Sequence, residues 1–400
     1  MDLERRSGLN TIEGLIEKLC PEGVEFVELQ EIFDIKNGYT PSKKNPDYWT
    51  DGSIPWFRME DIRKNGRVLN DSIQHVTPEA VKRGVLFPAN SIIMATTATI
   101  GEHALITVDS LANQRFTFLS KKVNRSIDLD MKFMFYYGYI LGDWCKRNTN
   151  TASFPSVNMK KFKKFSIPVP PLEVQNAIVE ILDTFTALQQ ELEAELEKRK
   201  KQYEYYREEQ LSFDDNEVEW KTLGEICEVK RGRVISKSYL NNHPGEYPVY
   251  SSQTANNGIF GYIDTYDYDF ESITWTTDGA NAGTVFYHNG RKFSITNVCG
   301  LLRIQDTGLI NTKFIYYVLT IIAKNHVSAG MGNPKLMSNE MSLIKIPIPP
   351  LEKQNEIVAI LDQFDALVND LSIGIPAEIN ARRQQLEYYQ NHLLTFKELP

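Results

Sequence analysis

Residue patterns that would carry catalysis are missing from this sequence. No G-x-x-x-x-G-K-[ST] loop is present for nucleotide phosphates, and no G-x-G-x-x-G follows a predicted first strand. The Asn/Asp-Pro-Pro-aromatic motif of an amino-methyltransferase is also absent, because the Pro-Pro pairs precede Leu172 and Leu351. The six histidines show no H-x-x-x-H or H-E-x-x-H spacing, so the sequence predicts neither a metal site nor a catalytic centre.

Composition is that of an ordinary chain of two or more domains, with 42% hydrophobic and 24% charged residues over 400 positions. Four widely separated cysteines, without a C-x-x-C pair, suit small core positions in a reducing cytosol: Cys20, Cys145, Cys227 and Cys299. No run of eighteen apolar residues occurs. We therefore expect a cytoplasmic protein that does not contact a membrane.

An internal repeat organises the chain. Residues 168–188 and 347–367 align without gaps and are identical at 15 of 21 positions. Residues 24–38 and 218–232 form a second repeated element, with 7 of 15 positions identical. Each half therefore opens in the same way and closes in the same way, which predicts two half-molecules in tandem.

Each closing repeat predicts a long helix. Prolines suit its first turn, and neither glycine nor proline interrupts residues 172–213, which would span roughly 60 Å as a helix. Steps of four and three predict a seam that packs lengthwise on another helix: Ile178, Leu182, Phe185, Gln189, Leu192, Leu196, Arg199, Tyr203 and Tyr206. The second copy has four extra residues near 372–376, where Gly374 suits a C′ position and Pro376 a new helix start. The preferred interpretation is two antiparallel spacer helices; the alternative is a solvent-facing hairpin within one enzyme domain.

Both interiors predict a mixed α and β domain, and we expect one fold in both with different loops. The first has strand composition at residues 53–57, 91–97, 104–108 and 115–119, followed by a helix at 129–147. The second has strands near 248–252, 272–277, 284–287 and 298–304, followed by a helix at 312–324. A short amphipathic helix is expected at 10–20, capped by Asn10. Trp56 and Trp275 are expected in the core.

Charge is unevenly distributed along the chain, whose formal net charge is −8. Residues 189–217 carry ten acidic and five basic side chains, whereas residues 121–164 carry ten basic and three acidic ones. Residues 218–342 are balanced, with eleven of each. The basic run at 160–164 fits either a solvated face or a contact to an acidic partner.

The order of domains and helices resembles the specificity (S, HsdS) subunit of a Type I restriction–modification enzyme. The resemblance rests on I-P-[VI]-P-P-L-E-x-Q-N at the start of each helix and on Q-x-E-Y-Y…L-[ST]-F at its close. Gly38-Tyr-Thr-Pro-Ser-Lys43 and Tyr247-Pro-Val-Tyr-Ser-Ser252 also resemble openings of the family's recognition domains. The implied fold is mixed α/β with two target-recognition domains separated by two long antiparallel helices. The implied segments are residues 1–166 (first recognition domain), 167–214 (spacer), 215–345 (second recognition domain) and 346–400 (spacer).

This resemblance implies a non-catalytic, sequence-specific DNA-binding subunit. A pseudo-two-fold axis between the halves would let both domains face one duplex, as in dimeric regulators. Since the two interiors differ, the target would be bipartite and asymmetric, with unread base pairs between its halves. The length of the spacer helices would set that gap.

Base reading needs bidentate donors and acceptors, and thymine methyls favour Thr, on exposed loops. The first-domain candidates are Tyr39, Thr40, Lys43, Arg58, Thr96, Thr97, Gln114 and Arg115. The second-domain candidates are Arg231, Arg233, Ser252, Gln253, Asn256, Asn257, Asp278, Asn281, Asn297 and Asn333. The alternative is that Asn and Thr at such places only form turns.

The resemblance also implies partner subunits. Two modification (methyltransferase) subunits would grip the helical repeats, with S-adenosylmethionine bound by them and no cofactor bound by this chain; restriction subunits would complete the complex. The expected contact residues are Leu172, Gln175, Tyr205, Tyr206, Leu351, Gln354, Tyr388 and Tyr389. Two other classes stay open: a self-sufficient enzyme, and a DNA-binding scaffold or regulator that uses the same repeat without restriction partners.

Overall fold

The computed structural model of the chain describes residues 12–123, 127–150, 154–214, 216, 218–328 and 332–400. The chain divides into two compact units. The first unit contains residues Met1–Glu191 and Ile379–Pro400, and the second contains Leu192–Glu378. Each unit therefore combines one mixed α/β domain with parts of the long helices. The segment boundaries expected at 166, 214 and 345 are not tested by this division and stay predictions.

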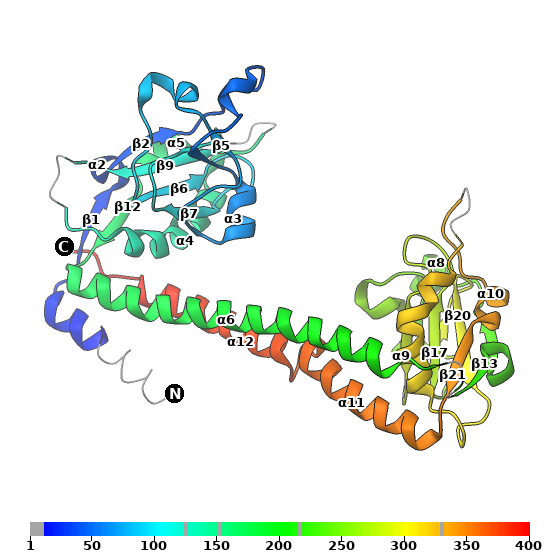
Figure 1. Cartoon of the computed structure of the whole chain (residues 1–400). Helices are drawn as coiled ribbons and strands as arrows, with labels where there is room; N and C mark the ends of the chain where they lie inside the picture. The colour runs from blue at the N-terminus through cyan, green and yellow to red at the C-terminus, as the bar shows by residue number, and fades with distance from the viewer. Residues whose placement is uncertain (1–11, 124–126, 151–153, 215, 217, 329–331) are drawn as a thin grey trace. The chain divides into compact units, whose positions relative to one another are not determined.

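A main sheet forms the centre of each domain (Figure 1), and four of its strands follow an equivalent order in both units. In the first unit the order is β2 (Phe33–Asn37), β9 (Phe116–Lys121), β6 (Ser91–Ala95), β7 (His103–Ile106) and β4 (Val68–Leu69). In the second it is β14 (Cys227–Arg231), β20 (Cys299–Ile304), β17 (Ser272–Thr276) and β18 (Val285–His288). All five residues of β6 and of β17 are buried, as expected for strands covered on both faces.

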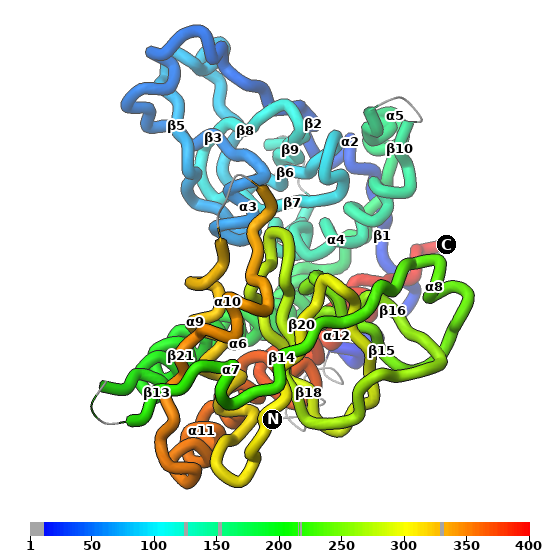
Figure 2. The backbone as a smooth tube through the Cα atoms, turned by 90° about the vertical axis from the view of Figure 1, so that its right-hand side faces the viewer, coloured from blue at the N-terminus to red at the C-terminus, as the bar shows by residue number. Residues whose placement is uncertain are grey.

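A smaller three-stranded sheet accompanies each main sheet. The first unit has β5 (His75–Val76), β3 (Ile54–Phe57) and β8 (Leu111–Ala112), which lie together in Figure 2. The second has β16 (Ile259–Ile263), β15 (Tyr247–Tyr250) and β19 (Ser294–Ile295). In both, the central strand is antiparallel to one neighbour and parallel to the other. The predicted sharing of one fold by both halves is confirmed.

One helix packs beneath each main sheet and confirms a predicted helix. In the first unit it is α4 (Met131–Arg147), capped by the Asp130 carboxylate, which accepts from the Phe133 N–H. In the second it is α9 (Thr312–Ile322), capped by Asn311. Other short elements are α2 (Leu29–Ile32), α3 (Met59–Asn65), β10 (Thr149–Asn150), β11 (Ser156–Val157), α5 (Met159–Lys163), α7 (Leu223–Ile226), α8 (Lys237–Asn242) and α10 (Ser338–Leu343).

The two repeats meet in space within each unit. Strand β1 (Glu25–Glu28) pairs antiparallel with β12 (Ser166–Val169), and β13 (Glu219–Thr222) pairs with β21 (Lys345–Ile348). The opening repeat therefore lies against the strand that leads into the long helix. Residues 12–19 are helical, whereas the expected cap Asn10 lies outside the described residues.

The long helices follow the predicted pattern. Helix α6 runs from Leu172 to Gln210, and the second copy is split into α11 (Leu351–Asn369) and α12 (Ile375–Leu393). The predicted break is confirmed, but Gly374 does not occupy the C′ position of α11, whose C-cap is Asp370. Gly374 instead precedes α12, where an added Cβ would lie 2.4 Å from the Ala366 carbonyl oxygen.

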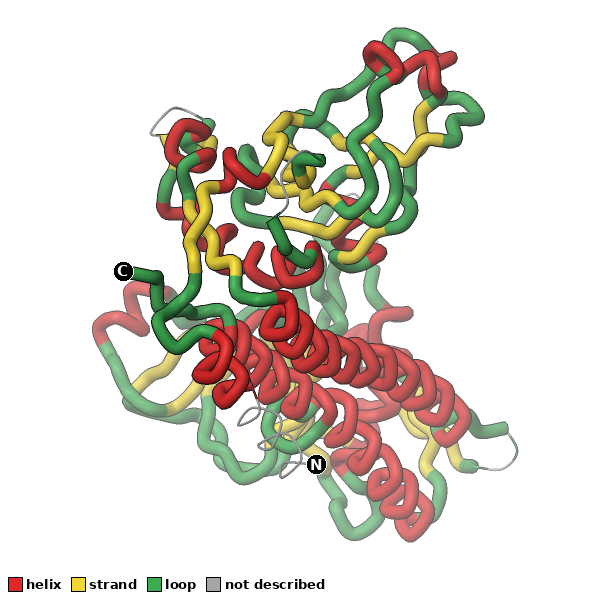
Figure 3. The backbone as a smooth tube through the Cα atoms, turned by 90° about the vertical axis from the view of Figure 1, so that its left-hand side faces the viewer, coloured by secondary structure: helices red, strands yellow, loops and turns green. Residues whose placement is uncertain are grey.

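In each unit the long helices lie side by side (Figure 3), and equivalent aromatic pairs join them. In the first unit Phe185 of α6 stacks on Tyr389 of α12, with ring centroids 4.8 Å apart. In the second, Tyr206 of α6 stacks on Phe364 of α11 at 5.5 Å. None of the nine predicted seam residues is exposed, so the predicted packing face is confirmed.

A repeated aspartate joins each long helix to the helix beneath the sheet. Asp183 of α6 accepts from the Tyr136 hydroxyl at 2.7 Å and from the Lys132 ammonium at 2.6 Å. Asp362 of α11 makes the same contacts with Tyr317 at 2.5 Å and Lys313 at 2.8 Å. These contacts fix each domain on its long helix.

The cores contain the predicted tryptophans and cysteines. Trp56 is 2% exposed and Trp275 is 0% exposed. All four cysteines are buried and free, and burial raises the pKa of Cys145, Cys227 and Cys299 to about 12. Among the described residues, the helices fall short of the length and apolar character that crossing a bilayer would require.

Candidate nucleic-acid interface

Three loops of the first unit meet at one edge of its main sheet. Strand β9 is antiparallel to both β2 and β6, with Thr117 opposite Asn37 and Phe116 opposite Ala95. The ends of β2 and β6 therefore lie beside the start of β9. Gly38 allows the close approach there, because a Cβ would lie 2.4 Å from the Ala112 carbonyl oxygen.

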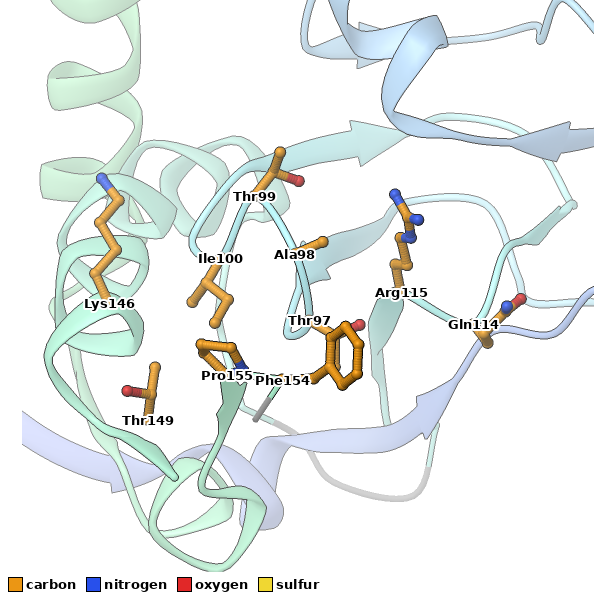
Figure 4. A pocket seen from close by; sticks show the side chains of 10 residues that line it. All are labelled: Thr97, Ala98, Thr99, Ile100, Gln114, Arg115, Lys146, Thr149, Phe154 and Pro155. Atoms are coloured by element: carbon orange, nitrogen blue, oxygen red, sulfur yellow. The ribbon is translucent and has the colours of Figure 1, made fainter. Parts of the chain in front are cut away.

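This edge brings together four of the predicted first-domain residues. The Thr40 hydroxyl donates to the Gln114 side-chain oxygen at 2.5 Å. Thr97, Gln114 and Arg115 line a hollow of about 790 Å³. Figure 4 shows Arg115 and Gln114 on one side of the hollow and Lys146 and Thr149 on the other. The planar amide and guanidinium groups at this edge are the donors and acceptors that base edges require.

Other predicted residues of the first unit have different surroundings. Thr96 is 4% exposed and shares a hydrogen bond with the Thr117 hydroxyl, so it cannot reach a base. Tyr39 is held in the protein, since its hydroxyl accepts from the Lys82 N–H at 2.9 Å. Arg58 is half-buried, with its guanidinium 3.2 Å from Glu60. Lys43 is exposed in the loop after β2.

The second unit places different side chains at the equivalent edge. Gly300 lies opposite Arg231, and Cys299 opposite Thr276, which matches the register of the first unit. The Arg231 guanidinium donates to the Asn297 carbonyl oxygen at 2.6 Å. Arg231 therefore corresponds to Asn37, and Asn297 to Gln114.

A short pairing adds Asp278 and Asn333 to this second edge. Asp278 forms an isolated bridge with Lys335, and the Gly279 N–H donates to the Pro334 carbonyl at 3.0 Å. Within the described residues, the buried Oδ1 of Asp278 has no hydrogen-bond partner. Asn281 is exposed in the same loop. This edge therefore combines a cation, amides and a carboxylate.

The smaller sheet of the second unit supplies the remaining predicted residues. The loop after β15 contains Ser252, Gln253, Asn256 and Asn257, and its Ser251 hydroxyl accepts from Thr296 at 2.9 Å. The Gln253 amide donates to the Ile259 carbonyl, and Asn256 and Asn257 adopt positive φ angles of 56° and 52°. Both asparagines therefore form a turn with their backbone, as the alternative interpretation expected, while their side chains remain exposed. Arg233 forms an ion pair with Asp267 at 3.0 Å.

Sequence reasoning missed seven of the ten residues that line the first hollow: Ala98, Thr99, Ile100, Lys146, Thr149, Phe154 and Pro155. Phe154 is 88% exposed, although an aromatic side chain is usually buried. Its place follows from two equivalent bridges: Ser156 pairs with Thr97 in the first unit, and Lys335 pairs with Asp278 in the second. Phe154 thus corresponds to Asn333, which the sequence had indicated.

The predicted partner-binding residues fall into two groups. Gln175 and Gln354 are fully buried, and each hydrogen-bonds main-chain groups of its own unit, such as the Asp130 N–H at 2.8 Å and the Asn311 N–H at 2.8 Å. They do not reach the surface, and Tyr206 and Tyr389 stack inside the helix pair. Tyr205, Tyr388 and Leu172 are 62%, 63% and 41% exposed, whereas Leu351 is half-buried.

Comparison with known proteins identifies the class. Residues 21–199 and 216–381 match the family model for the Type I restriction modification DNA specificity domain. The chain belongs to the DNA specificity subunits of Type I restriction–modification systems, which are the non-catalytic targeting part of those enzymes.

Individual relatives agree with this assignment. The chain is 43% identical over 362 residues to the specificity subunit of the Type I restriction enzyme EcoprrI of Escherichia coli, covering 87% of this chain and 89% of the relative. It is 36% identical over 311 residues to the MpnII specificity subunit of Mycoplasma pneumoniae, covering 62% of this chain and 93% of that protein.

Solved structures support the fold. The S subunit of a Type I system from M. genitalium superposes with a TM-score of 0.58 at 17% identity, over 93% of this chain and 96% of that one. A chain from a study of complex assembly and conformational transition of the type I R-M system gives a TM-score of 0.61 at 18% identity, over 93% and 97%.

Proposed function

We propose that each unit of this specificity subunit reads one half of an asymmetric, bipartite DNA target. The observation that carries this proposal is that equivalent strand ends present different side chains in the two units. Asn37 and Gln114 of the first unit correspond to Arg231 and Asn297 of the second. Amides pair best with adenine and guanidinium groups with guanine, so the two halves of the target should differ.

The gap between the half-sites is assigned to the long helices. Helix α6 is continuous over 39 residues, and the break between α11 and α12 lies in the residues added to the second repeat. A helix rises about 1.5 Å per residue, so changing its length by one turn moves its ends by roughly 5 Å. Such a change should alter the number of unread base pairs.

Catalysis in the complex is assigned to partners. Two modification subunits would dock near the exposed Tyr205 and Tyr388, which occupy equivalent places in the two repeats. They would bind S-adenosylmethionine and transfer its methyl group, and restriction subunits would reach the DNA through them. The DNA on which this complex would act lies in the cytoplasm, so we place the complex there.

Exchange of one domain tests the reading proposal. Residues 22–165 are replaced by the corresponding segment of a relative with a different target, and the methylated sequence of host DNA is determined. One half of the target should change and the other should stay. The matched control is exchange of residues 218–342, which should change the opposite half. Alteration of both halves by either exchange would contradict the two-reader proposal.

A further inference from the structure

Helices α5 and α10 are the same element in the two units. The Leu29 N–H donates to the Phe165 carbonyl at 2.9 Å, and the Leu223 N–H donates to the Ile344 carbonyl at 2.9 Å. Each helix is anchored by one fully buried side chain, Phe162 in α5 and Met341 in α10. These contacts set a residue-by-residue correspondence in which Phe162 matches Met341.

Side chains around these anchors differ in charge. Four lysines surround Phe162, whereas the matching positions around Met341 are Asn, Glu, Ser and Leu: Lys160, Lys161, Lys163 and Lys164 against Asn339, Glu340, Ser342 and Leu343. The formal charge of these four positions is therefore +4 in the first unit and −1 in the second. All four lysines are exposed, and none forms an ion pair with a carboxylate in the described part of the chain. Met341 is buried in the same way without flanking lysines, so the lysines are not needed to anchor the helix.

The lysines line a hollow of about 720 Å³ beside the end of α4. Trp144 and Asn148 of that end line it as well. Lys146, in the last turn of α4, lines the hollow at the edge where β2 and β6 end. Strand β11 joins the two regions, since the Val157 N–H donates to the Thr96 carbonyl at 2.9 Å and α5 begins two residues later. The lysine surface therefore adjoins the candidate base-reading loop.

A surface that binds double-stranded DNA explains these lysines better than a surface that only faces solvent. A duplex carries about one negative charge per 1.7 Å of its axis, and lysine neutralises phosphates without reading the base sequence. Four like charges within five residues repel one another, and an anionic backbone removes this repulsion. An ammonium group on a flexible stem can meet a phosphate in any sequence context.

We propose that α5 is a phosphate-binding surface of the first unit that α10 of the second unit does not match. The salt-dependent, sequence-independent part of the DNA affinity then comes mainly from the first unit, and the second unit contributes recognition with less non-specific binding. This inference rests on the proposed function, because it requires the first unit to meet DNA at its reading edge.

The test uses the full chain assembled with its modification subunits. The variant Lys160→Gln with Lys164→Gln removes two charges, and Asn339→Lys with Leu343→Lys adds two at the matching positions of the second unit. Binding to a fluorescent duplex without the target is measured by anisotropy from 50 to 200 mM salt. The slope of log affinity against log salt should become shallower by about 0.9 for each phosphate that the first variant no longer neutralises. It should become steeper by about 0.9 for each phosphate that the added lysines of the second variant neutralise.

A matched control keeps the result interpretable. Lys18→Gln with Lys397→Gln makes the same chemical change at exposed positions of the first unit outside α5, and the slope should not change. The methylated sequence should be the same for all variants, because phosphate contacts carry no base information. A Lys160/Lys164 variant with the slope of the control overturns the proposal. Loss of modification subunits from that variant also overturns it, since α5 would then bind protein. Neither result affects the domain-exchange test of the two-reader function.

Discussion

His103 is fully buried between β7 and α4 in the first unit. Its ring N–H donates from Nε2 to the Phe135 carbonyl oxygen at 3.0 Å, and the ring lies against Tyr139. Burial, helped by the nearby Arg67 guanidinium, lowers the pKa of His103 from 6.5 to about 4. The imidazole is therefore neutral in the folded protein at neutral pH.

The pKa of His103 predicts an acid-sensitive first unit. An unfolded histidine binds a proton below about pH 6.5, whereas folded His103 binds it only near pH 4. Its stabilising contribution is thus complete above pH 6.5 and falls by about 1.4 kcal/mol per pH unit as the pH drops toward 4. His103→Gln should flatten this dependence in urea unfolding followed from pH 7 to pH 4.5. The exposed His392→Gln is the control, and an equal flattening by both variants would refute the assignment.

Single residues were predictable where backbone position decides their role. Arg231 and Gln114 stand beside the ends of strands whose composition is visible in the sequence, and the structure places them at equivalent edges of the two main sheets; their contact with bases stays a prediction. Thr96 directly follows the last residue of β6 and is buried like the residues of that strand, so its side chain does not reach the exposed edge. Gln175 fills a polar site made by the distant loop before α4, which spacing along the helix does not reveal.

At the scale of elements, the repeated aspartate explains how a domain is held on its helix. Lys132 and Tyr136 of α4 correspond to Lys313 and Tyr317 of α9, so each domain contributes the same two donors. Burial raises the pKa of Tyr136, which keeps its hydroxyl protonated as a donor to Asp183. The ammonium contact is half-exposed, so the tyrosine hydrogen bond should dominate.

Replacing Asp183 by Ala should loosen the first domain on α6. The buried Tyr136 hydroxyl loses the Asp183 carboxylate and keeps only the longer contact to the Thr186 hydroxyl at 3.3 Å, which should lower the unfolding free energy by about 1–3 kcal/mol. Methylation by the assembled complex should slow, while the methylated sequence stays the same, because the reading loops are untouched. Asp143→Ala is the control on α4, since it breaks only an exposed ion pair with Lys146. Equal loss of stability in the two variants would argue against the clamp.

The elements themselves were largely predictable. Each predicted strand overlaps an observed one, for example 91–97 against β6 and 272–277 against β17, because apolar β-branched runs bounded by turn residues indicate strands. The pairing of the strands was not predictable, because it brings together β2 and β9, which are far apart in sequence. The role of Gly374 was also misplaced, since α11 ends before it, with Asp370 as its C-cap.

For the whole molecule, the exposed tyrosines predict the number of partner subunits. Tyr205 of the second unit and Tyr388 of the first stand in matching places, and each follows a glutamate in the repeated E-Y-Y. Tyrosine is a frequent hot spot, where truncation costs about 2 kcal/mol or more of binding. The docking feature that we propose therefore occurs twice in the chain.

Removing one docking tyrosine should remove one partner. Tyr388→Ala should convert a complex with two modification subunits into one that holds the second only weakly, and the double variant with Tyr205→Ala should bind neither firmly. Native mass spectrometry of the purified assembly measures the composition. Glu208→Gln, a neighbouring position on α6, is the control. Complete two-to-one assembly of the double variant would place the docking surface elsewhere.

Residues 379–400 belong to the first unit: the Val24 N–H donates to the Lys397 carbonyl at 2.9 Å, and Leu394 and Val24 lie in the same hydrophobic core. The second unit, by contrast, is one continuous segment, residues 192–378. During synthesis on the ribosome, the first unit therefore cannot close until residues 379–400 have been made. All residues of the second unit precede residue 379, so they are made before the first unit is complete.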